Sequence, residues 1–151
     1  MEGIPFFLQE VDQAGNMVRR LGVQGYPKAN FGGKCPKLSI FKSVSLPQQL
    51  LLQIVELPDG QAYLTLNRST KQSGGAYGEN MRQTAIMLAC KAEHLVETTY
   101  IQGGALARTD VGQNCRLCER PHCAQRAEPP IARPLMFDPS ENSVSTFNFK
   151  V

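Results

Sequence analysis

Residues 114–126, with the sequence NCRLCERPHCAQR, hold three of the five cysteines of this chain, Cys115, Cys118 and Cys123. Cys115 and Cys118 form a C-x2-C pair, and a gap of four residues leads on to Cys123. A C-x2-C pair places two sulfurs on one tight turn, so both can reach one metal ion or two corners of a cluster. The loop is therefore interpreted as one side of a metal or iron–sulfur site, around which a small sensor domain folds.

The cysteine count and the N-terminal sequence bear on the cellular compartment. No basic stretch followed by an apolar run opens the chain, and no apolar run approaches the ~20 residues of a membrane span. We therefore expect a cytoplasmic protein, in which disulfides are rare, and the odd number of cysteines also argues against a disulfide set. Ligand duty for the clustered cysteines is the favoured interpretation, and free or buried thiols are the alternative.

Zinc and iron–sulfur sites both take four ligands, and the loop supplies three. Cys35, Cys90 or a histidine must supply the fourth. Arg116, Arg120 and Arg126 lie among the cysteines, and such positive charge lowers thiolate pKa values and offsets the negative charge of a cluster. This pattern favours an anionic iron–sulfur cluster, with a structural zinc site as the alternative.

The composition is that of an ordinary globular domain. The 151 residues are 42% hydrophobic and 19% charged, which suits one domain with a real hydrophobic core. The net charge of +3 is mild and no helix-turn-helix pattern is present, so direct nucleic-acid binding is not expected. The sequence has no G-x-S-x-G, P-loop or H-E-x-x-H motif, so we expect neither enzymatic activity nor a catalytic residue.

Alternating apolar residues separated by turn residues predict two β-hairpins, at residues 4–23 and at residues 48–69. The first hairpin is expected to turn at Ala14-Gly15-Asn16. The second turns at Pro58-Asp59-Gly60, where proline presets φ and glycine accepts a positive φ.

Helical patterns are weaker than the strand patterns. Residues 37–43 and residues 91–100 are predicted as helices, the second from apolar residues at helical spacing. Residues 81–90 fit either a central strand or a buried helix, and residues 143–151 alternate as an edge strand does. The expected fold is α+β, an antiparallel sheet with helices packed on it.

The run CRLCER at residues 115–120, followed by CAQRA at residues 123–127 and Pro129-Pro130, resembles the C-terminal domain of bacterial short-chain fatty acyl-CoA regulators. These are XRE-type transcription factors that control propionyl-CoA, glyoxylate and acetate metabolism. Weaker matches follow in the family's order: IPFF at residues 4–7, GGKCP at residues 32–36, Gln53 with Asp59-Gly60, and LAC at residues 88–90.

The resemblance implies one GAF-like ligand-sensing domain over residues 1–151, with a cysteine cluster loop at residues 112–130 and an extended tail at residues 131–151. It implies that the domain binds a short-chain acyl-CoA or a related metabolite and carries a [4Fe–4S] cluster. Carried over by position, the cluster ligands are Cys35, Cys115, Cys118 and Cys123, with Cys90 as the alternative to Cys35.

Two other functions stay open at this point, an iron–sulfur redox sensor and a structural zinc-binding interaction module. The resemblance implies a DNA-binding domain or partner chain and no membrane, and it leaves a homodimer as an option. Arg20, Phe31 and Tyr100 are candidates for lining the ligand pocket, although a core aromatic residue or a surface charge is the favoured explanation of each.

Overall fold

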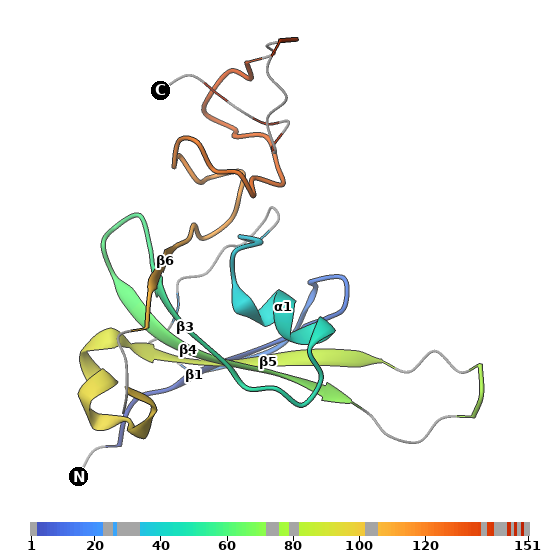
Figure 1. Cartoon of the computed structure of the whole chain (residues 1–151), viewed down its shortest axis with the longest axis vertical. Coiled ribbons are helices and arrows are strands. Elements are labelled where there is room, and N and C mark those ends of the chain that lie inside the picture. The colour runs from blue at the N-terminus through green and yellow to red at the C-terminus, as the bar shows by residue number, and fades with distance from the viewer. Residues whose placement is uncertain are drawn as a thin grey trace.

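The computed structural model describes residues 3–22, 26, 34–71, 76–78, 82–101, 106–136, 139–140, 145, 147 and 149. These residues form a six-stranded sheet in the order β2-β1-β5-β4-β3-β6, which one α-helix covers on one face (Figure 1). The elements are β1 (Phe7–Asp12), β2 (Met17–Leu21), α1 (Ser39–Ser45), β3 (Leu51–Glu56), β4 (Ala62–Lys71), β5 (Gln83–Lys91), the 3-10 helices η1 (Ala92–Glu97) and η2 (Thr99–Ile101), and β6 (Arg108–Asp110).

The predicted α+β class is confirmed, with one parallel pair added to the expected antiparallel sheet. Strands β2, β1, β5, β4 and β3 pair antiparallel with their neighbours, whereas β6 pairs parallel with β3. The chain reaches β6 from β5 through η1 and η2, so it crosses the sheet before it pairs again. Such a crossover lets a strand return in the same direction as its neighbour.

The two predicted hairpins are confirmed, and short polar side chains stabilise both turns. In the first, the Asp12 carboxylate accepts hydrogen bonds from the backbone N–H groups of Ala14 (3.0 Å) and Asn16 (2.8 Å). In the second, Asp59 accepts a hydrogen bond from the Gln61 N–H at 3.0 Å. Each turn also contains a glycine with positive φ, Gly15 at 82° and Gly60 at 81°.

Residues 81–90 could be strand or helix by sequence, and the structure assigns β5 to the centre of the sheet. Its side chains alternate between two apolar clusters on opposite faces. The face that carries α1 buries Ala85, Met87 and Ala89 with Phe7 and Val55. The other face buries Cys90 with Ile54, Leu64 and Leu66. The apolar Ile86 and Leu88 lie on this second, partly exposed face and complete the continuous apolar run that made the sequence ambiguous.

Helix α1 lies close to the predicted residues 37–43, and a glutamine from the sheet fixes its start. The Gln53 side-chain amide accepts a hydrogen bond from the Ser39 N–H and donates one to the Lys37 carbonyl, each at 2.9 Å. Residues 91–100 do not form the expected single α-helix. Lys91 belongs to β5, and Thr98, with φ −98° and ψ 147°, separates two short 3-10 helices.

The chain after β6 leaves the sheet and folds without regular structure where it is described (Figure 1). The strand expected at residues 143–151 lies mostly outside the described residues, but Phe149 forms an isolated bridge with Leu135. None of the helices in the described ranges is long and apolar enough to cross a membrane.

Candidate functional site

The C-x2-C turn is held by Asn114, which was not among the predicted site residues. Asn114 is fully buried, and its side-chain oxygen accepts a hydrogen bond from the Leu117 N–H at 2.7 Å. The Cys118 N–H donates to the Cys115 carbonyl at 3.4 Å, which closes the turn. An asparagine directly before a C-x2-C pair is the local signal for this turn, since its side chain mimics a backbone acceptor.

Arg126 organises the loop from within. Its guanidinium donates hydrogen bonds at 2.9 Å to each of three carbonyl oxygens, those of Cys115, Cys118 and Arg120. Its Cζ atom lies 4.7 Å from the ring centroid of Phe149, so the segment that ends the chain contacts the loop. The positive charge expected among the cysteines is therefore present, and it is buried.

The other two arginines of the loop differ from Arg126 and from each other. Arg120 ties the loop to the sheet, because it donates to the carbonyls of Glu56 (3.1 Å) and Val111 (3.3 Å) and pairs with Asp110 at 3.4 Å. Arg116 is exposed. Of the three arginines among the cysteines, Arg126 is thus buried, Arg120 is partly buried and Arg116 is exposed to solvent.

Cys35 lies close enough to Cys115 to act on it electrostatically, although the two are far apart in sequence. Both are 5% exposed, while Cys118 and Cys123 are partly exposed. Burial raises the pKa of the Cys115 thiol, a hydrogen bond from the Ala127 backbone lowers it, and nearby Cys35 raises it again. Arg126 and Cys123 also act on the Cys115 pKa, the first lowering and the second raising it. Cys35 and Cys123 therefore each lie within electrostatic reach of Cys115.

Cys118 packs against Gly112, the first residue of the cysteine loop. A Cβ atom built on Gly112 would lie 2.8 Å from both the Cβ and the Sγ of Cys118. Real Cβ atoms do not approach that closely, so the backbone of residue 112 can contact Cys118 only because Gly112 has no side chain.

Cys90 lies on the opposite face of the sheet from Cys35. It packs with Ile54, Leu64 and Leu66, whereas Cys35 belongs to the cluster beneath α1 together with Val111. Burial, and then the Glu97 carboxylate, raise the pKa of the Cys90 thiol. The structure thus brings Cys35, not Cys90, towards the cysteine loop.

Tyr26 adds a polar group beside Cys35. Its hydroxyl is buried and has no hydrogen-bond partner among the described residues. Burial raises the pKa of Tyr26, and the nearby Cys35 raises it further. A buried O–H donor without an acceptor is costly, and a thiolate or a sulfide at Cys35 would supply one.

The thiols do not surround the position of a single ion. In the part of the chain that the structure describes, no group of three or more His, Cys, Asp or Glu side chains is arranged to hold a metal ion. The sulfurs of one tetrahedral zinc would lie roughly 3.8 Å apart, from a Zn–S distance of about 2.3 Å. The buried cation Arg126 and the unused O–H donor of Tyr26 are the polar groups that lie near these thiols.

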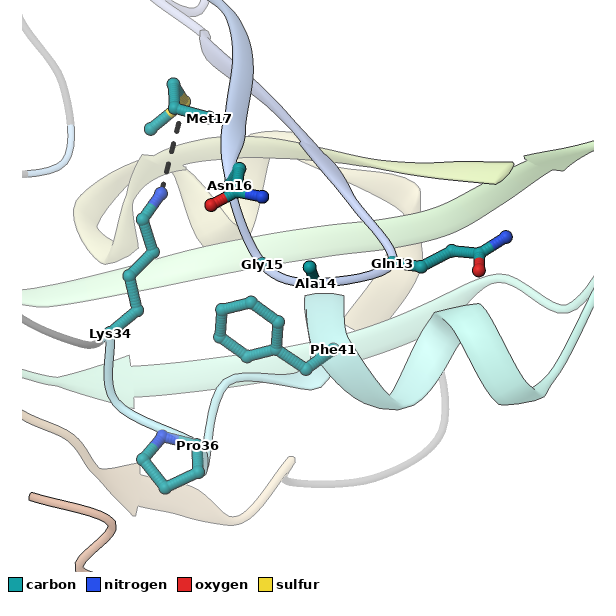
Figure 2. A pocket seen from close by; sticks show the side chains of 8 residues that line it. All are labelled: Gln13, Ala14, Gly15, Asn16, Met17, Lys34, Pro36 and Phe41. Carbon is teal, nitrogen blue, oxygen red and sulfur yellow. Dashed lines mark hydrogen bonds between the residues drawn. The ribbon is translucent and has the colours of Figure 1, made fainter. Parts of the chain in front are cut away.

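A cavity of about 500 Å³ lies under the turn between β1 and β2 (Figure 2). We call it the turn cavity. The turn, the segment around Cys35 and one residue of α1 supply its lining: Gln13, Ala14, Gly15, Asn16, Met17, Lys34, Pro36 and Phe41.

Lys34 is the cation of the turn cavity. Its Nζ lies 4.0 Å from the Met17 Sδ, and burial, with nearby Arg20, lowers the pKa of Lys34 to about 8. The ammonium therefore stays mostly charged at neutral pH. Lys34 was not a predicted site residue, although it occupies the middle of the GGKCP match.

Of the three predicted pocket residues, the two that the structure describes do not line the turn cavity. Arg20 does not line the turn cavity; it donates to the Tyr26 carbonyl at 2.7 Å and lies 4.7 Å from the Phe7 ring centroid. Tyr100 lies in η2, is 45% exposed and does not line this cavity. Phe31 lies outside the described residues.

Known proteins resemble the chain over nearly its whole length. The HTH-type transcriptional regulator RamB of Mycobacterium tuberculosis is 35% identical over 156 residues, 99% of this chain and 33% of RamB. The propionyl-CoA carboxylase regulator of Cereibacter sphaeroides is 34% identical over 145 residues, 95% of this chain and 32% of the regulator. The chain therefore spans about a third of the length of these relatives, which are transcriptional regulators rather than enzymes.

A solved structure of a Mycobacterium tuberculosis transcriptional regulator superposes with a TM-score of 0.85 at 27% identity, over 97% of this chain and 46% of that one. Residues 1–147 match the family described as short-chain fatty acyl coenzyme A regulator, C-terminal. The fold, the relatives and this match lead to one conclusion: the chain belongs to the short-chain fatty acyl coenzyme A regulators, as their C-terminal regulatory domain.

Proposed function

We propose that this domain senses a short-chain acyl-CoA or a related metabolite and carries a [4Fe–4S] cluster. The cluster ligands in this proposal are Cys35, Cys115, Cys118 and Cys123. A DNA-binding domain, in the same chain or in a partner chain, would receive the signal as a shift between two states. The observation that carries the proposal is that two buried thiols from distant parts of the chain, Cys35 and Cys115, act on each other electrostatically.

The surroundings of the thiols support a bound anionic cluster. When bound, a [4Fe–4S] cluster supplies a redox-active group that links the loop to the segment around Cys35. The Ala127 backbone N–H donates to the Cys115 sulfur, and the Arg126 charge lowers the pKa of that thiol. The Tyr26 hydroxyl beside Cys35 is available as a further donor. Hydrogen bonds of this kind to ligand sulfurs tune such clusters.

The acyl-CoA part of the proposal rests on the kinship and on the turn cavity. The family description names short-chain fatty acyl coenzyme A, and one relative is a propionyl-CoA carboxylase regulator. The turn cavity, at about 500 Å³, falls within the ~300–1,000 Å³ of small-molecule sites.

The test of the cluster is metal and acid-labile sulfide content, with a visible spectrum, on protein purified without oxygen. We expect about four iron and four sulfide per chain. Cys35→Ala and Cys90→Ala form a matched pair, because both remove a buried thiol. The first is expected to lose iron and sulfide, and the second to keep both.

Other outcomes separate the alternatives. Loss of iron in Cys90→Ala alone would overturn the assignment of Cys35. One zinc and no sulfide would replace the cluster with a structural zinc site. Calorimetry with propionyl-CoA tests the ligand half separately, and wild-type protein that binds no CoA ester would remove it.

A redox sensor is a second candidate, favoured by the exposure of one side of the loop. Cys118 lines a cavity of about 260 Å³ together with Pro58, Asp59, Gln113 and Leu117. A cluster held there would meet small oxidants. Cluster-loaded protein whose fold and partner binding stay unchanged on exposure to air would exclude this function.

A further inference from the structure

Lys34 is a partly buried cation with no carboxylate partner among the described residues. Its neighbour is the Met17 thioether, at 4.0 Å. The two acidic side chains of the adjacent hairpin are already engaged: Glu10 pairs with Arg19 at 3.2 Å, and Asp12 accepts the hydrogen bonds of the turn. A partly buried charge without a counter-charge loses solvation and regains little in return.

A second cation increases this imbalance. Arg20 is close enough to act on Lys34 electrostatically, and it too forms no ion pair within the described ranges. Its guanidinium instead donates to the Tyr26 carbonyl and stacks on the Phe7 ring. Neither cation forms an ion pair within the described ranges, and an anion bound beside Lys34 would relieve their mutual repulsion.

The rest of the turn cavity suits an apolar or flat group next to that anion. Figure 2 shows the Phe41 ring beneath the turn, with Lys34 beside it and Pro36 below. The ring approaches the turn closely, since a Cβ on Gly15 would lie 3.3 Å from Phe41 Cε1. At about 500 Å³ the cavity can hold one end of a CoA ester.

We propose that the turn cavity binds the phosphate-bearing nucleotide end of a CoA ester, with Lys34 as the residue that contacts a phosphate. This inference rests on the proposed acyl-CoA function, and it assigns the polar end of that ligand to a site. Phosphate is the anion that a lone lysine in such a cavity commonly binds, as a point charge without a fork geometry.

The test compares binding of propionyl-CoA, adenosine 3′,5′-bisphosphate and inorganic phosphate to wild-type protein and three variants by calorimetry. Lys34→Gln removes the charge. Ala14→Phe fills the cavity from an exposed turn position. Lys42→Gln is the matched control, an exposed lysine on α1 that does not line the cavity.

We expect Lys34→Gln and Ala14→Phe to bind both propionyl-CoA and the bisphosphate about tenfold more weakly or worse, as loss of a charge-assisted contact predicts. Lys42→Gln should bind like the wild type, and inorganic phosphate should bind much more weakly than the bisphosphate. Equal binding of all probes by Lys34→Gln and wild type would overturn the site while leaving the acyl-CoA function intact.

Two further outcomes separate this site from the proposed function. Binding of the bisphosphate in a Lys34-dependent way, without binding of propionyl-CoA, would support the phosphate site and overturn the acyl-CoA function. Absence of binding of every probe to the wild type would overturn both.

Discussion

Arg126 is the residue whose loss should damage the cysteine loop most. Arg126→Met keeps much of the volume but leaves three carbonyl oxygens, those of Cys115, Cys118 and Arg120, without their donor. A hydrogen bond from a charged group contributes about 1.5–3 kcal/mol. One of the three bonds is fully buried and water can reach the other two, so we expect a total loss of about 3–5 kcal/mol.

Arg126→Lys should lose less, about 2 kcal/mol, because one ammonium cannot reach three acceptors in the geometry of the guanidinium fork. The matched control is Arg116→Lys in the same loop. Arg116 is exposed, so that substitution should stay within about 0.5 kcal/mol of the wild type.

The assay must measure the stability of the loop as well as that of the sheet, because a loop can open without global unfolding. Urea unfolding followed by far-UV circular dichroism reports the whole domain. Hydrogen exchange reports the loop through the amides of Leu117 and Ile131, which donate to Asn114 and to the Arg116 carbonyl. If Arg126→Met matched Arg116→Lys in both measurements, the central role given to Arg126 would be wrong.

Three other perturbations test separate parts of the structure. Gly112→Ala places a Cβ 2.8 Å from the Cys118 Cβ and Sγ, so it should lower the free energy of unfolding by about 1–3 kcal/mol in thermal unfolding. In the control, Gly3→Ala, no atom lies within 4 Å of the new Cβ, so stability should not change. Equal effects of the two substitutions would contradict the close packing of Gly112 against Cys118. Gln53→Ala removes two hydrogen bonds at the start of α1 and should cost about 1–3 kcal/mol in urea unfolding, and an unchanged midpoint would refute this link between helix and sheet. Hydrogen bonds from the Asn16 side chain and backbone hold the pKa of Asp12 below its usual value, so its contribution to stability is present above about pH 4 and is lost as pH falls through the folded pKa. Asp12→Asn should therefore flatten the fall in melting temperature between about pH 5 and pH 2, and a fall as steep as in the wild type would exclude this role.

The hairpins could be predicted because their signals are local. Asp12 with Gly15, and Pro58 with Asp59 and Gly60, specify their turns through side-chain acceptors and positive φ. The residues that flank these turns alternate, which fixes the strands. Nothing farther along the chain is needed to place either hairpin.

For residues 91–100, the local sequence pattern does not predict the observed structure. Their apolar spacing fits a helix, yet Lys91 continues β5 as the partner of Tyr63, and β-branched Val96, Thr98 and Thr99 favour extended backbone. Pairing with β4 therefore extends the strand beyond the point where the sequence predicts a helix. Only the register of the sheet, a long-range property, decides this.

The choice between Cys35 and Cys90 depends on the same long-range property. Cys90 pairs with Leu64, so the alternation of β5 directs its side chain to the face opposite α1. From the sequence alone, it is not possible to predict which face of the sheet Cys35 or Cys90 occupies. The cavity residues Lys34 and Phe41 escaped prediction for a similar reason, since the first hairpin must fold over them before a cavity exists.

The short segment from Lys34 to Pro36 joins the two sites proposed for this domain. Lys34 and Pro36 line the turn cavity, whereas Cys35 between them is buried in the core and acts on the Cys115 thiol. A ligand that contacted both flanking residues would constrain the backbone that carries Cys35. Thermodynamic linkage then requires reciprocity: the factor by which the ligand changes cluster affinity is the factor by which the cluster changes ligand affinity. A domain built in this way would report metabolite and cluster as one combined state, so a regulator that reads the cysteine loop would respond to both.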